Sequence, residues 1–179
     1  MDKISSNAFL KAWADTVDSR KERMLSLWRQ PKPFTAYVKG NEESIMQEVA
    51  TRLDLLCYHR DYYSIDTVLY KAEDLVPGIP EGSFWFKDIR VAFEHENNFN
   101  NNLYQEIAHL LITDCDLRVL VTYPDGNIDS ILDYLHRIIS SNRKATTFSQ
   151  EESILMIFGY EADFRWKGSV YKSEGWKNL

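Results

Sequence analysis

Large apolar residues recur at near-helical spacing in the first thirty positions: they are Phe9, Trp13, Val17, Met24 and Trp28. This spacing predicts one amphipathic helix that ends before Pro31 and Pro33. A second helix is expected after Asn41, a residue type that caps helix N-termini. Its core-facing stripe consists of Ile45, Val49, Leu53 and Leu56.

Two stretches in the middle of the chain alternate in the manner of β-strands. Residues 62–70 (YYSIDTVLY) are rich in β-branched and aromatic side chains, which predicts one strand. After the turn residues PGIPEG, the stretch SFWFKDIRVAFEHE is either one long strand or the outer leg of a hairpin. One face of this stretch carries Trp85, Ile89, Val91 and Phe93, and the other carries Asp88, Arg90, Glu94 and Glu96.

Helical and strand patterns alternate in the second half of the chain. The stretch LYQEIAHLL has a helical apolar stripe and is followed by LRVLVTY, a buried strand, so the two flanking strands are expected to be parallel neighbours. Another amphipathic helix spans residues 128–139, and strands over 153–160 and 165–172 close the sheet. The pattern predicts a three-layer α/β domain with a central mixed sheet flanked by helices. We expect one domain over 1–179, with an N-terminal helical extension (1–40) and an α/β core (42–172).

The chain is acidic, with a net charge of −6 and a pI near 5.2. This charge argues against broad electrostatic attraction to nucleic acid, although a metal-dependent enzyme can bind phosphate through its cations and a local basic patch. Basic residues cluster early and late in the chain, and each cluster is either part of a basic face or a solvated helix surface. The clusters are Arg20, Lys21, Arg23, Arg29 and Lys32, and Arg137, Arg143 and Lys144.

Targeting and cysteine patterns favour a cytoplasmic protein. The N-terminal segment carries charges among its apolar positions, unlike a secretory signal. No apolar run approaches the roughly 18 residues of a membrane span, and we expect no membrane association. Cys57 and Cys115 lie far apart and match no metal-ligand spacing, so we interpret them as buried thiols.

Three acidic residues form the candidate site. Glu94 and Glu96 are two residues apart on a strand and emerge from the same face, at the end that leads into a helix. Asp66 lies within an otherwise apolar strand, where Asp is depleted. Three such carboxylates repel one another, so they must protonate or bind a cation, and oxygen ligands favour Mg²⁺, Mn²⁺ or Ca²⁺. The alternative is that the two glutamates merely face water on a half-buried strand.

The order of these features resembles the PD-(D/E)xK phosphodiesterase superfamily, which has the restriction-endonuclease-like fold. The resemblance covers roughly residues 42–123 and includes a helix, a strand with Asp66, a strand ending in Glu94-His95-Glu96, a helix, and LRVLVTY. It implies that Asp66 and Glu94 bind Mg²⁺ (or Mn²⁺), that Glu96 stands in the place of the motif lysine, and that Glu48 on the first core helix assists. It also implies an endonuclease that hydrolyses phosphodiester bonds in DNA, for which a homodimer would suit the cutting of two strands.

Two alternatives to this function remain. A glutamate at the lysine position also fits a catalytically inactive member of the fold that acts as a binding or regulatory module. An acidic protein-interaction partner, of the DNA-mimic or immunity type, would instead display a broad acidic patch. Of the histidines, His95 is expected to point away from the glutamates, whereas His109, three residues after Glu106, either reaches the site or forms a surface pair with it.

Overall fold

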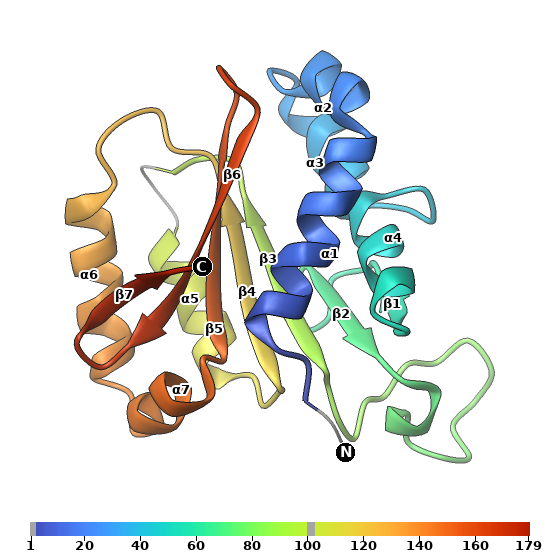
Figure 1. Cartoon of the computed structure of the whole chain (residues 1–179). Coiled ribbons are helices and arrows are strands. Elements are labelled where there is room, and N and C mark those ends of the chain that lie inside the picture. The colour runs from blue at the N-terminus through green and yellow to red at the C-terminus, as the bar shows by residue number, and fades with distance from the viewer. Residues whose placement is uncertain (1–2, 100–102) are drawn as a thin grey trace.

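The computed structural model describes residues 3–99 and 103–179. Within these ranges, seven strands form one mixed sheet with helices against both faces, so the predicted three-layer α/β architecture is confirmed (Figure 1). The strands lie in the sheet in the order in which they occur in the chain. They are β1 (Leu56–Tyr58), β2 (Thr67–Tyr70), β3 (Val91–Glu96), β4 (Leu117–Thr122), β5 (Ile154–Tyr160), β6 (Arg165–Lys172) and β7 (Gly175–Asn178).

Helices from the two halves of the chain cover opposite faces of this sheet, as Figure 1 shows. The apolar residues of β3 follow the same division: Val91 and Phe93 belong to the core under the N-terminal helices, and Ala92 belongs to the core under the later helices. The first layer comprises α1 (Ser6–Ser19), α2 (Lys21–Leu27), α3 (Pro31–Lys39) and α4 (Ile45–Arg52). The second comprises α5 (Leu103–Ile112), α6 (Asp129–Ser140) and α7 (Ala145–Glu151), and a 3₁₀ turn, η1, spans Ala72–Asp74.

The single helix predicted at the N-terminus is wrong, because α1 and α2 are separated at Arg20, which has a φ of −117°. A third helix, α3, then begins at Pro31. Proline is well tolerated at the first position of a helix, where its missing N–H would have no partner in any case. These helices pack directly on the sheet, since the rings of Trp13 and Phe93 have centroids 5.9 Å apart.

The second predicted helix is present as α4, but it is shorter and is capped by another residue. The hydroxyl of Ser44 accepts a hydrogen bond from the backbone N–H of Gln47 at 3.2 Å, which is N-cap geometry. Asn41, the expected cap, instead accepts from the N–H of Glu43 at 2.8 Å. The helix ends at Arg52, so the last two positions of the predicted stripe lie outside it.

The predicted strand over residues 62–70 is too long, because β2 begins only at Thr67. Tyr62 and Ile65 close a tight turn through two backbone hydrogen bonds of 2.9 and 3.0 Å. Between them Tyr63 and Ser64 adopt positive φ values of 50° and 71°. Asp66 therefore stands where a turn leads into a strand, and it does not lie at a strand centre.

Only the last six residues of the alternating stretch SFWFKDIRVAFEHE form a strand, β3. The preceding segment is a loop that is tied to the sheet by a buried ion pair between Arg90 and Asp74, with N···O distances of 2.5 and 2.8 Å. Trp85, expected on the core face, is 55% exposed. The alternation of apolar and polar residues predicted a longer strand, because this pattern does not reveal the buried ion pair between Arg90 and Asp74.

The β-α-β unit is confirmed: β3 and β4 are parallel neighbours, with Glu94 opposite Leu120, and α5 connects them. The helix predicted over 128–139 and the last two predicted strands correspond to α6, β5 and β6. The short elements β1, α7 and β7 were not predicted. Among the residues described here, no helix has the length and apolar character needed to cross a membrane.

Candidate functional site

Glu94 is the centre of the candidate site. It lies two residues before the end of β3, on the face that α5 covers, and it is only 1% exposed. An ionised carboxylate at such a position is very unfavourable without a compensating partner. The surroundings of this one side chain therefore decide what the site can do.

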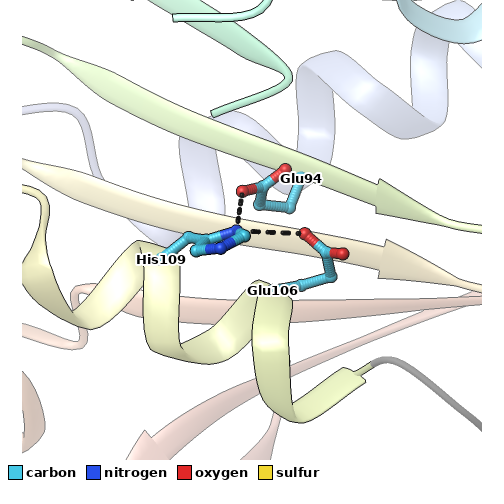
Figure 2. A group of neighbouring side chains, drawn as sticks. All are labelled: Glu94, Glu106 and His109. Carbon is cyan, nitrogen blue, oxygen red and sulfur yellow. Dashed lines mark ion pairs between the residues drawn. The ribbon is translucent and has the colours of Figure 1, made fainter. Parts of the chain in front are cut away.

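Helix α5 brings a second carboxylate and an imidazole to Glu94. His109 Nδ1 lies 3.5 Å from Glu94 Oε1 and 3.6 Å from Glu106 Oε2 (Figure 2). Positions three residues apart share one helix face, which is why both side chains reach the same point. One ligand atom from each of Glu94, Glu106 and His109 falls within 4.8 Å of the others. The sequence left open whether His109 and Glu106 reach the site or form a surface pair, and the structure places both side chains at the site.

The pKa values of the two glutamates are both raised. Burial, followed by the negative charges of Asp66 and Glu106, raises the pKa of Glu94 to about 10. The pKa of Glu106 is also raised, first by burial and then by the charge of Asp66. Without a cation Glu94 is therefore protonated at neutral pH, and a bound cation would displace its proton.

Two buried polar atoms of this cluster lack a hydrogen-bond partner within the described residues: Glu94 Oε1 and His109 Nδ1. Buried polar atoms almost always have a partner, so two such atoms 3.5 Å apart are unusual. Both atoms are metal-ligand types, and a cation between them would satisfy both. The residues present thus fit a divalent metal ion.

Asp66 contacts Glu94 through its backbone N–H, and the charge of its carboxylate also acts on Glu94. Its N–H donates to Glu94 Oε2 at 3.2 Å, its Oδ2 accepts from the N–H of His95 at 2.9 Å, and its Oδ1 contacts the ammonium of Lys39. The charges of Asp66 and Glu96 thus act on the cluster, but the ligand atoms that lie within 4.8 Å of one another are those of Glu94, Glu106 and His109. Glu96 lies at the end of β3, where its Oε1 accepts from the N–H of Asn98 at 2.6 Å.

Lys39 is a charged residue of the site that the sequence did not indicate. It is the last residue of α3, a helix that the pattern did not predict, and its ammonium forms an ion pair with Asp66. Both side chains are about one-fifth exposed, at 22% and 19%. The site therefore contains a lysine, although none lies in the tripeptide Glu94-His95-Glu96.

Glu48, expected to assist, does not join the cluster. It forms ion pairs with Arg20 and Arg52, each at 2.6 Å, on the N-terminal helical layer. Burial opposes its ionisation, but hydrogen bonds from Arg52 and Arg20 outweigh this effect and lower the pKa of Glu48. These contacts give Glu48 a role in joining α4 to the helices around it.

His95 points to the opposite face from Glu94, as expected. Its Nε2 lies 2.8 Å from the hydroxyl of Tyr123, and its ring packs against Phe34. Burial, with a further contribution from the positive charge of Lys39, lowers the pKa of His95 to about 3. The imidazole is therefore neutral and belongs to the core under the N-terminal helices.

Comparisons of the chain with protein-family models, with curated proteins and with solved structures give no match. The functional argument consequently depends on the chemistry of the side chains themselves.

Proposed function

We propose that this protein is a metal-dependent endonuclease that hydrolyses phosphodiester bonds in DNA, with its metal held at Glu94. The observation that carries the proposal is the buried Oε1 of Glu94, which has no hydrogen-bond partner among the described residues and faces His109 and Glu106. A carboxyl group with a strongly raised pKa beside two further ligand types is a typical signature of a functional site.

Glu94, Glu106 and His109 are the proposed ligands. Imidazole is a better ligand for transition metals than for Mg²⁺, so this set favours Mn²⁺ over the Mg²⁺ expected from an oxygen-only set. When bound, such a metal polarises a phosphoryl oxygen and lowers the pKa of a water molecule.

The chain's own residues contribute orientation and charge around this centre. The N–H of Asp66 fixes Oε2 of Glu94, which leaves Oε1 directed toward α5. The ammonium of Lys39 stands beside Asp66 and supplies the positive charge that a phosphate approaching this acidic region requires. Because Glu96 occupies the position of the motif lysine, we assign the role of the cation to Lys39.

The resemblance to the PD-(D/E)xK superfamily supports the same proposal. The expected order of elements is present in α4, Asp66, β3 with Glu94 near its end, α5 and β4, with β1 as an addition before Asp66. Burial of Glu94 argues against a DNA-mimic role for this cluster, since a mimic would display its acidic groups to solvent. A homodimer and a cytoplasmic location stay predictions from the sequence.

The test combines metal binding with cleavage. Mn²⁺ at about one hundred times its dissociation constant stabilises a folded protein by about 2.7 kcal/mol, which corresponds to roughly 5–11 °C in Tm at this chain length. We expect this increase for the wild-type protein and not for Glu94→Gln. Asp116→Asn is the matched control, because Asp116 is another half-buried carboxyl with a raised pKa but precedes β4 at the other end of the sheet.

Cleavage of supercoiled plasmid DNA in Mn²⁺, lost in Glu94→Gln and kept in Asp116→Asn, would support the endonuclease. Metal binding without cleavage of DNA or RNA would point to the non-catalytic module. Absence of any Mn²⁺ effect on Tm would refute the metal site itself.

A further inference from the structure

A cleft opens beside the candidate site, between α3 and the residue that follows β3. Its volume is about 380 Å³. Six of the residues that line it are Lys32, Thr35, Ala36, Lys39, Gly40 and Asn97. Because Asn97 directly follows Glu96, the cleft lies at the carboxyl end of β3, where open α/β sheets commonly bind ligands.

The cleft is continuous with the site through Lys39. The ammonium of Lys39 contacts Asp66, and the N–H of Asp66 donates to Glu94, so one lysine lines the cleft and also touches the first neighbour of the proposed metal ligand. Lys39 therefore belongs both to the cleft and to the surroundings of Glu94.

The charges in this cleft suit a phosphate. Lys32 is exposed and forms no ion pair with any carboxylate in residues 3–99 or 103–179, so its charge is available to a ligand. Lys39 adds a second ammonium, although Asp66 partly neutralises it. Two other members of the early basic cluster are engaged with the protein, since Arg20 pairs with Glu48 and Arg29 pairs with Glu161.

The remaining walls suit the rest of a nucleotide. Asn97 donates its amide N–H to the hydroxyl of Thr35 at 2.7 Å, which holds the two sides of the cleft together. Ala36 and Gly40 offer an apolar surface against which a sugar can lie. The combination of free positive charge, polar groups and an apolar surface matches a nucleic-acid backbone.

We propose that Lys32 and Lys39 hold a backbone phosphate of a nucleic-acid strand that also reaches the Glu94 site, so that the substrate is a polynucleotide and not a mononucleotide. The inference rests on the proposed function for the identity of the second site. It also explains how an acidic chain binds an acidic substrate, because one local pair of lysines faces the strand.

The experiment is a fluorescence-anisotropy titration of a labelled single-stranded DNA oligonucleotide with the full chain, in EDTA and separately in Ca²⁺. Removal of one phosphate contact lowers the salt slope of log K by about 0.7, which at ~0.1 M salt corresponds to roughly fivefold weaker binding. We expect this loss for Lys32→Ala and recovery of binding in Lys32→Arg. Lys87→Ala is the matched control, since Lys87 is an exposed lysine before the amino end of β3, and it should change binding less than twofold.

Three results would overturn the inference. They are equal losses in Lys32→Ala and Lys87→Ala, absence of oligonucleotide binding in both buffers, and competition by thymidine 5′-monophosphate or inorganic phosphate as effective as that by the oligonucleotide. The measurements also distinguish the proposed metal site at Glu94 from the proposed phosphate-binding cleft. A Lys32 effect in EDTA together with no Mn²⁺ effect on Tm removes the metal site and retains the cleft, whereas Mn²⁺ stabilisation without a Lys32 effect does the opposite.

Discussion

Replacing Glu94 by Gln should stabilise the metal-free protein, although it removes the central ligand of the proposed site. The amide has nearly the same shape as the carboxyl group and keeps an oxygen that can accept the Asp66 N–H, which now bonds Glu94 Oε2 at 3.2 Å. It carries no charge and needs no proton to remain neutral. The stability of the wild-type protein should therefore depend on pH at this position, and the stability of the variant should not.

The magnitude follows from the pKa of Glu94, which burial and the neighbouring charges raise from 4.5 to about 10. The folded protein keeps this proton while the unfolded chain releases it above 4.5, so the stabilising contribution is complete below 4.5 and is lost progressively as the pH rises toward 10. At about pH 7 the loss spans roughly 2.5 pH units, and at about 1.4 kcal/mol per unit it is roughly 3.5 kcal/mol.

The assay is urea unfolding of wild type and Glu94→Gln in EDTA, at several pH values from about 5 to about 8, the range over which the linkage should act. We expect the two proteins to differ little at the acid end and the variant to be more stable by about 3.5 kcal/mol near pH 7. Glu22→Gln, a change at an exposed glutamate, should show no such pH-dependent difference. A variant that is equally or less stable than wild type at neutral pH, with no trend across the range, would refute the claim that Glu94 is buried among like charges.

Three further predictions concern other features of the fold. Lys39→Ala removes the ammonium from Asp66 and should lower the free energy of unfolding by about 1–2 kcal/mol. Stabilisation of this variant by Mn²⁺ should persist while its cleavage of DNA falls. Retention of full cleavage would exclude Lys39 from the reaction. Arg90→Met leaves Asp74, 2% exposed, without its cationic partner and should cost about 3–5 kcal/mol in urea unfolding, much of it recovered in an Arg90→Met, Asp74→Leu double variant. Burial raises the pKa of Cys57 to about 12 and that of Cys115 to about 11, so both thiols should react slowly with a thiol reagent at about pH 8 until the chain is unfolded; rapid labelling of the native protein would contradict this.

The sequence predicted best where the pattern is local and continuous. The unit β3-α5-β4 follows from the pattern of a buried strand, a helical apolar stripe and a second buried strand. The three elements and the parallel pairing of the two strands were predicted correctly. The central position of Glu94 follows from the same unit. His109 was within reach of the same reasoning, because its spacing from Glu106 already places both on one helix face.

The sequence predicted poorly where contacts between distant segments decide. Asp66 was assigned to a strand because alternation does not reveal the left-handed turn at Tyr63 and Ser64. Lys39 was missed because its helix, α3, begins at Pro31, and this proline was interpreted as the end of the preceding helix. Glu48 was assigned to the site from its place beside an apolar stripe, whereas its partners Arg20 and Arg52 determine where it points.

The order of the strands has a consequence for how this sheet can assemble. Since every strand from β2 to β7 pairs with its immediate predecessor along the chain, a growing sheet can add each new strand at an exposed edge, and no strand has to insert between two that are already joined. The segments that must be closed are consequently those between consecutive strands, which keeps the entropy of loop closure small at each step. Assembly can thus spread outward in both directions from the parallel pair that carries Glu94.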